Sequence, residues 1–159
     1  MEVSARRAVS FDLPRMVELV TAAIDELRPS RGGALFARRE ARADVTAEGL
    51  TPWLGGDHAV AFLGTIDEAP IGVATAHLEH LRDGGRLAVV DELYVEDGAR
   101  GIGVGESLMD AVVAWADERG CLGIDAMVLP GNRESKNFFE TFGLTARAIV
   151  VHRVLGSRT

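Results

Sequence analysis

Apolar residues recur along the chain with two periods, which predict alternating helices and strands. Between Asp12 and Pro29 they fall three and four apart, as on one face of a helix: Met16, Leu19, Val20, Ala23, Ile24 and Leu27. Asp12 stands where an N-cap is expected, and Pro14 lies in the first turn. Residues 103–119 repeat the period, with a stripe of Leu108, Val112 and Trp115 flanked by Val104 and Ala111. The sequence therefore predicts two amphipathic helices.

Short apolar runs bounded by turn residues predict the strands, of which the first is weakly patterned. They span Glu2–Val9, Ala59–Asp67, Pro70–Leu81, Leu87–Val95, Cys121–Leu129 and Ala146–Leu155. The turn Asp83-Gly84-Gly85 joins the third and fourth as a hairpin. Shorter helices are predicted at Leu35–Asp44 and Glu134–Thr141. The order β-α-α-β-β-β-α-β-α-β, without repeat or linker, predicts an α/β fold: one domain, residues 1–159, with a single mixed sheet flanked by helices.

Composition narrows the classes of function. Hydrophobic residues make up 47% of the chain and charged residues 26%, as in ordinary globular proteins. A formal charge of −7 argues against general nucleic-acid binding. We find no apolar window of the ~18 residues that a membrane span needs, and no secretory leader. Cys121 is the only cysteine, so an internal disulfide is excluded and the cytoplasm is the expected compartment.

A glycine-rich turn, R-G-I-G-V-G, separates the strand 87–95 from the helix 103–119. Glycines at such a turn accept positive φ angles and let a ligand approach the backbone. The free N–H groups of a helix start then favour phosphate or pyrophosphate. The turn is not a P-loop, because Gly98 and Gly103 are followed by Val104 and Gly105. It is not a dinucleotide fingerprint either, because Glu106 occupies the sixth position from Gly101.

Two strings resemble the signatures of the GNAT superfamily of N-acetyltransferases. The first is Leu93-Tyr94-Val95 followed by Arg100-Gly101-Ile102-Gly103-Val104-Gly105. The second begins Asn132-Arg133-Glu134-Ser135, reaches Phe138-Phe139 and ends in Phe142-Gly143-Leu144. The resemblance is specific across Val89 to Leu144 and implies a mostly antiparallel central sheet with two parallel strands that splay apart.

The resemblance also implies a cosubstrate and an activity. Acetyl-CoA would lay its pantetheine arm along Leu93, Tyr94 and Val95, as an added strand would. Its pyrophosphate would sit on the loop Arg100 to Gly105, with Asn132 and Ser135 beside the cofactor, although turn chemistry alone could explain Asn132. The implied reaction moves an acetyl group to a primary amine of a small molecule or peptide. The first two helices would border the acceptor pocket.

Asp91 and Glu92 stand at the family's usual place for the base that takes the amine proton. Strand alternation predicts that they point to opposite faces, with Asp91 on the side of Leu93 and Val95. Either carboxylate could be the base, directly or through water. Alternatively, both are solvated carboxylates at a strand end.

The proton donor is where the chain departs from the family pattern. Many relatives carry tyrosine where this chain has Phe139, and the only tyrosine is Tyr94, which alternation places opposite Leu93 and Val95. A tyrosine acid is therefore not expected. The departure leaves a second hypothesis open, a CoA-binding or sensing module with little or no catalysis.

Other features favour structural roles. His77 and His80 are three apart in a strand and face opposite sides, so we predict no metal site. His77 could reach the acceptor, but a surface or core role is favoured. The arginines Arg38, Arg39 and Arg42 are expected on a solvated helix face. The last predicted strand, at Ile149 to Leu155, could form a homodimer edge.

Overall fold

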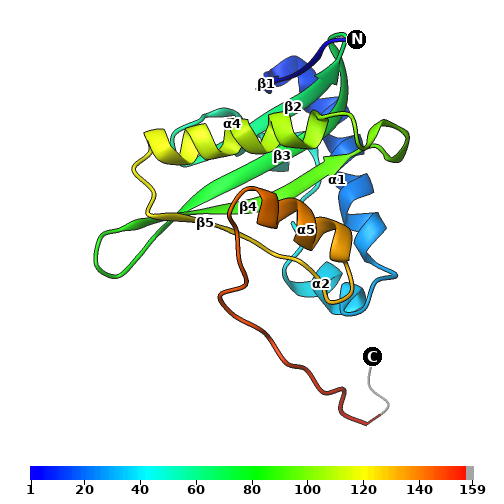
Figure 1. Ribbon diagram of the computed structural model, residues 1–159, viewed down its shortest axis with the longest axis vertical. Coiled ribbons are helices and arrows are strands. Elements are labelled where there is room, and N and C mark those ends of the chain that lie inside the picture. Colours follow the sequence, from blue (N-terminus) through cyan, green and yellow to red (C-terminus); the bar gives the residue numbers. More distant parts are fainter. Residues whose placement is uncertain (157–159) are drawn as a thin grey trace.

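The computed structural model describes residues 1–156, and a five-stranded sheet forms its centre (Figure 1). The strands are β1 (Val3–Arg7), β2 (Ala59–Ile66), β3 (Ala69–His80), β4 (Arg86–Val95) and β5 (Gly123–Ala126), neighbours in that order. The pairs from β1 to β4 are antiparallel, whereas β4 and β5 are parallel. The expected α/β fold with a mixed, mostly antiparallel sheet is confirmed.

Helices cover both faces of the sheet (Figure 1). On one face lie α4 (Val104–Glu118) and α5 (Arg133–Thr141); on the other lie α1 (Leu13–Leu27), α2 (Gly33–Arg39) and the short α3 (Ala47–Leu50). The predicted stripe of α4 is buried, with Leu108, Val112 and Trp115 at most 2% exposed. Gly64 lets α4 approach the sheet, because a Cβ there would lie 2.5 Å from Val104.

The start of α1 differs from the prediction. Asp12 precedes α1, but its carboxylate does not cap the helix. It accepts the Val9 N–H at 2.8 Å and two hydrogen bonds from Arg6, at 2.8 and 2.9 Å. The Arg6 guanidinium holds the pKa of this buried carboxyl below its usual value. Asp12 therefore ties the end of β1 to the 3₁₀ turn Ser10–Asp12.

Three predicted elements have other bounds. The second helix ends at Arg39, short of the predicted Asp44. The fifth strand shortens from Cys121–Leu129 to Gly123–Ala126, because its ladder with β4 stops there. The predicted strand Ala146–Leu155 is wrong for the described chain: this segment is extended but pairs with nothing, and its residues are exposed.

Candidate functional site

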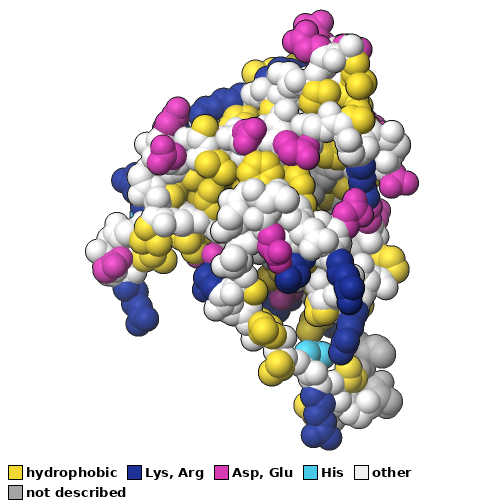
Figure 2. Space-filling view, viewed as in Figure 1, with side chains coloured by type: hydrophobic (Ala, Val, Ile, Leu, Met, Phe, Trp, Pro, Cys, Tyr) yellow, Lys and Arg dark blue, Asp and Glu magenta, His cyan; other side chains and the backbone are white. Residues whose placement is uncertain are grey.

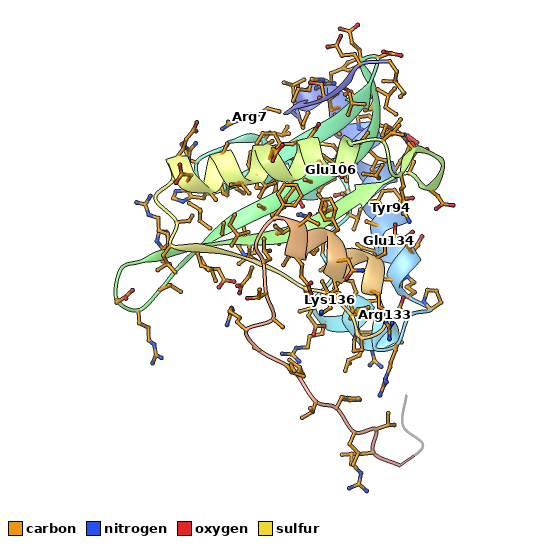
Figure 3. All side chains as sticks on the ribbon, in the orientation of Figure 1. Arg7, Tyr94, Glu106, Arg133, Glu134 and Lys136 are labelled. Atoms are coloured by element: carbon orange, nitrogen blue, oxygen red, sulfur yellow. The ribbon has the colours of Figure 1, made fainter. Side chains whose placement is uncertain are left out.

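The parallel strands β4 and β5 part halfway along β4, at the edge of the sheet. Their ladder ends where Val90 pairs with Ala126, yet β4 continues to Val95. Residues 90–94 of β4 and 126–129 of the departing segment line the cleft that opens between them. Residues from α1, Phe36 and the start of α5 close its sides. In Figure 3, Tyr94 lies on β4 where this strand passes α1, and the labelled Arg133, Glu134 and Lys136 come from α5. Both signature strings thus meet at one cleft.

The glycine turn lies at the end of β4, directly before α4. Gly101 and Gly103 have φ angles of +81° and +100°, a region that suits glycine. Gly103 precedes the helix, and no side chain caps the α4 N-terminus. Within residues 1–156, the N–H groups from Gly101 to Glu106 donate to no backbone acceptor. The loop is therefore a cradle of free donors at the positive end of a helix dipole, which fits a pyrophosphate.

Arg100 is anchored beside this cradle by acidic neighbours. Its Nε donates to the Val95 carbonyl at 2.9 Å, and its Nη2 lies 2.6 Å from the carboxylate of Glu26 on α1. Asp97 is 3.6 Å from Nη1. The positive charge of Arg100, which the sequence predicts near the pyrophosphate, is therefore partly balanced by the carboxylates of Glu26 and Asp97.

The second signature forms the N-terminus of α5. Asn132 caps this helix, since its Oδ1 accepts the Ser135 N–H at 3.2 Å. Both residues also line the cleft, as does Phe139, which is 9% exposed. Asn132 therefore has both roles: it caps the helix, as turn chemistry alone would explain, and it lines the cleft. Gly105 brings α5 close to the loop, because a Cβ there would lie 3.2 Å from the Phe138 ring.

A β-bulge in β4 corrects the prediction for the two carboxylates. Opposite β3, Thr75 pairs with Glu92 and Ala76 with Val90, so Asp91 is an extra residue in the ladder. The extra residue interrupts the alternation. Both carboxylates consequently contact groups on the α1 side of the sheet, whereas Leu93 and Val95 pack in the core on the α4 side. The prediction that Asp91 shares a side with Leu93 and Val95 is wrong; Tyr94 does lie opposite them.

Glu92 is held in a buried ion pair. Arg42 Nη2 donates to Glu92 Oε1 at 2.9 Å and Arg42 Nε to Oε2 at 3.3 Å, and these side chains are only 7% and 6% exposed. The Thr75 hydroxyl also donates to this carboxylate. The Arg42 guanidinium stacks on Trp53, 3.8 Å from the ring centroid. Arg42 is thus not on a solvated face, and both carboxylate oxygens of Glu92 already accept hydrogen bonds from neighbouring side chains.

Asp91 makes different contacts. Trp53 Nε1 donates to its Oδ2 at 3.0 Å, and its Oδ1 lies 2.8 Å from His77 Nδ1. The Asp91 side chain is 19% exposed and lines the cleft. The hydrogen bond from Asp91 raises the pKa of His77 above its ordinary value, with a smaller contribution from Glu79. Of the two carboxylates, Asp91 is the one coupled to a group that titrates near neutral pH.

Metal-binding clusters and membrane-spanning helices are both absent from residues 1–156. No group of three or more His, Cys, Asp or Glu side chains is placed to hold a metal ion in this part of the chain. No helix among these residues has the length and apolarity to cross a membrane.

The chain belongs to the acetyltransferase (GNAT) family, whose model matches residues 23–144. No curated protein sequence matches the chain.

Solved structures give the same fold at low sequence identity. AAC(6')-Iy, in complex with the bisubstrate analogue CoA-S-monomethyl-acetylneamine, is 21% identical with a TM-score of 0.72, covering 98% of this chain and 99% of that one. A mutant of the BH1408 protein from Bacillus halodurans is 18% identical with a TM-score of 0.79, covering 98% and 99%. Glucosamine-6-phosphate N-acetyltransferase from Arabidopsis thaliana is 16% identical with a TM-score of 0.67, covering 98% and 100%.

Proposed function

We propose that this protein is a cytoplasmic N-acetyltransferase that moves an acetyl group from acetyl-CoA to a primary amine of a small molecule or peptide. The observation that carries the proposal is the run of free N–H groups from Gly101 to Glu106, next to a cleft between parting strands. Family membership implies acetyl-CoA as cosubstrate. Asp91, which lines the cleft and pairs with no arginine within residues 1–156, favours a cationic acceptor over an anionic one.

The chain holds the cosubstrate through its backbone. The N–H groups of the loop bind the pyrophosphate, and β4 beyond Val90, free of β5, hydrogen-bonds the pantetheine amides. Acetyl-CoA supplies an activated thioester when bound. Leu93 to Val95 position it, while Asn132, Ser135 and Phe139 border it from α5. Positioning of the thioester against the amine supplies most of the rate enhancement.

Asp91 takes the amine proton, and His77 positions Asp91. Asp91 faces the cleft, so its carboxylate accepts the proton from the incoming ammonium or amine, directly or through water. The His77 Nδ1–H donates to the charged Asp91 Oδ1 across the 2.8 Å contact and so holds the carboxylate in position. Glu92 is less available to the amine, because its carboxylate oxygens already accept hydrogen bonds from Arg42 and Thr75.

This route predicts an acidic limb in the pH–rate profile. A protonated His77 would offset the negative charge of Asp91 on which uptake of the amine proton depends. Because Asp91 raises the pKa of His77, activity should increase with pH through a pKa above 6.5. Asp91→Asn should move the limb to lower pH, because the charge that holds the proton on His77 is gone, and should lower the plateau about 10²-fold. His77→Gln should remove the limb.

Glu92→Gln is the matched control, because it alters the neighbouring carboxylate. Steady-state kinetics of each variant from pH 5 to 9 would show which carboxylate controls the acidic limb. A limb that moves with Glu92→Gln and not with Asp91→Asn would contradict the proposed route.

Phe139 tests the alternative of a CoA-binding module with little catalysis. We expect Phe139→Tyr to raise kcat up to about 10²-fold while the Kd for acetyl-CoA stays nearly unchanged, because it adds a proton donor to the cleft. Phe138→Tyr is the control, since that ring packs against Phe142 and the start of α4. An unchanged kcat would mean that protonation of the thiolate does not limit turnover.

The proposed function as a whole is tested by an amine panel. The protein is incubated with acetyl-CoA and primary amines, including amino sugars, polyamines and peptides, and free thiol is measured. We expect at least one amine to release thiol well above the rate of a Gly103→Glu variant. Saturable acetyl-CoA binding without acetylated product from any amine would leave the binding module as the correct function.

A further inference from the structure

A pocket with a volume of about 330 Å³ lies between α1 and α2, outside the cleft between β4 and β5. α2 begins directly against the end of α1, because a Cβ at Gly33 would lie 1.9 Å from the Leu27 carbonyl oxygen. Residues 42, 43 and 45, which follow α2, complete the lining of the pocket. Ile24 is the one residue that lines both cavities. The pocket is therefore a second cavity, with a volume in the range of small-molecule sites.

Arg42 brings a buried positive charge to this pocket. Its side chain is 7% exposed; its Nε and Nη2 donate to Glu92, whereas its Nη1 donates to no acceptor within residues 1–156. Every fully buried side-chain nitrogen or oxygen in this part of the chain has a hydrogen-bond partner, so Nη1 retains exposed surface. Arg42 lines the pocket and is not among the residues that line the cleft. The free edge of its guanidinium, Nη1 with Nη2, is therefore directed to the pocket.

Thr21 and Arg28 add two further donors to the lining of the pocket. Thr21 is exposed on α1, so its hydroxyl can donate to a ligand. Arg28 follows the last residue of α1, and its Nε donates to Asp25 Oδ1 at 3.0 Å, which leaves both terminal nitrogens for a ligand. Each arginine of the pocket thus already has one carboxylate partner, Glu92 for Arg42 and Asp25 for Arg28.

These groups suit a carboxylate that carries a single negative charge. A guanidinium edge presents two N–H groups in the geometry that a carboxylate accepts. Asp25 and Glu92 lie beside the two arginines and would repel the second charge of a dianion such as phosphate. The remaining walls are apolar and suit a short hydrocarbon chain: Ile24, Ala37, Ala43 and Val45.

Recognition of such an anion has to be local. The chain carries a formal charge of −7, which repels anions at a distance. On the face that Figure 2 draws, dark-blue Lys and Arg side chains are interspersed with magenta Asp and Glu side chains, so the described residues form no broad basic patch there. Affinity for a carboxylate would therefore come from the donors inside the pocket.

We propose that the pocket between α1 and α2 binds a small monocarboxylate, which accepts hydrogen bonds from the Nη1–Nη2 edge of Arg42, from Thr21 and from Arg28. The hydrocarbon chain of the ligand lies on the apolar walls. Occupancy also reaches the cleft, because Arg42 stacks on Trp53 and Trp53 Nε1 donates to Asp91. The site follows from the pocket and its donors, and it does not depend on acetyl transfer.

The first test is a titration of the isotope-labelled protein with sodium butyrate at constant ionic strength, observed by NMR in the indole N–H signals of its two tryptophans. The Trp53 signal should shift and saturate in the millimolar range, because the Arg42 guanidinium lies 3.8 Å from the centroid of this ring. Trp115, whose Nε1 donates to the Gly56 carbonyl, is the internal control and should not shift. Butanamide, which has a similar shape without the charge, should leave both signals in place. A Trp53 signal that does not saturate with butyrate, or that responds equally to butanamide, would overturn the proposal.

The second test uses variants to separate the pocket from the cleft and from general charge. Ala37→Phe should fill the pocket and abolish the shift with unchanged circular dichroism, because Ala37 is only partly buried. Arg28→Gln should raise the Kd for butyrate about 5–10-fold, because it removes a charged donor. Arg38→Gln is the matched control: it removes the same charge from an exposed position of α2 outside the pocket, and the Kd should stay within about 2-fold of the wild type. A saturable shift that persists in Ala37→Phe would place butyrate in the cleft, and an equal Kd in the two arginine variants would mean general attraction; either result would overturn the proposal.

Discussion

Replacing Gly103 by glutamate is expected to weaken acetyl-CoA binding about 10²-fold. The φ angle of +100° at Gly103 strains any side chain, and the new carboxylate would stand among the N–H groups that hold the pyrophosphate. Loss of two charge-assisted hydrogen bonds corresponds to about 3 kcal/mol, which is a factor of roughly 10² in Kd. Isothermal titration calorimetry measures the change directly.

Gly84→Glu is the matched control. Gly84 lies in the hairpin between β3 and β4, has a φ angle of +90° and has nothing within 4 Å of an added Cβ. It therefore imposes the same charge and similar strain far from the loop, and its Kd should match the wild type. If Gly103→Glu and Gly84→Glu bind acetyl-CoA with equal affinity, the loop is not part of the cofactor site.

Replacing Arg42 by alanine is expected to lower the free energy of unfolding by about 3–5 kcal/mol. The change leaves Glu92 charged and buried without its partner, and this is the costly way to break a buried ion pair. Arg42 also holds residues 40–45 against the sheet and stacks on Trp53, so packing is lost as well. Urea denaturation, followed by tryptophan fluorescence, measures the effect.

Arg39→Ala serves as the control, because this arginine of α2 is 71% exposed and should change the free energy of unfolding by less than about 0.5 kcal/mol. The double variant Arg42→Met, Glu92→Leu should recover much of the loss, since it removes both charges from the interior. If Arg42→Ala alone is as stable as the wild type, Glu92 is more hydrated than its burial indicates.

The periodicity of the sequence predicted the elements that pack on one face. The apolar spacing of α1 and α4 and the turn before β4 follow from local chemistry, so their positions could be read without a partner. The glycine loop was also visible, because its chemistry belongs to one short string. Arg42 could not be placed in this way, since its burial depends on Glu92, fifty positions away in the chain. The segment 146–155 has the composition of a strand, but composition does not show whether another strand pairs with it, and in the described chain none does.

The bulge had a sequence signal that strict alternation missed. Ala88, Val90, Leu93 and Val95 all pack in the core on the α4 side, so the spacing along β4 is two, three and two. The spacing of three between Val90 and Leu93 marks the place where one residue is extra. Reading this interruption would have placed Asp91 and Glu92 on one face.

Asp91 is therefore a residue that the architecture could do without. Without Asp91, Val90 and Leu93 would be two positions apart and the ladder with β3 would be regular. Glu92 would still contact Thr75 and Arg42. Selection for folding alone gives no reason to retain an insertion that breaks a central ladder. What the insertion adds is a second carboxylate at the mouth of the cleft, held by Trp53 and His77. Of the ten residues of β4, Asp91 is the one whose retention during evolution is explained by chemistry and not by folding.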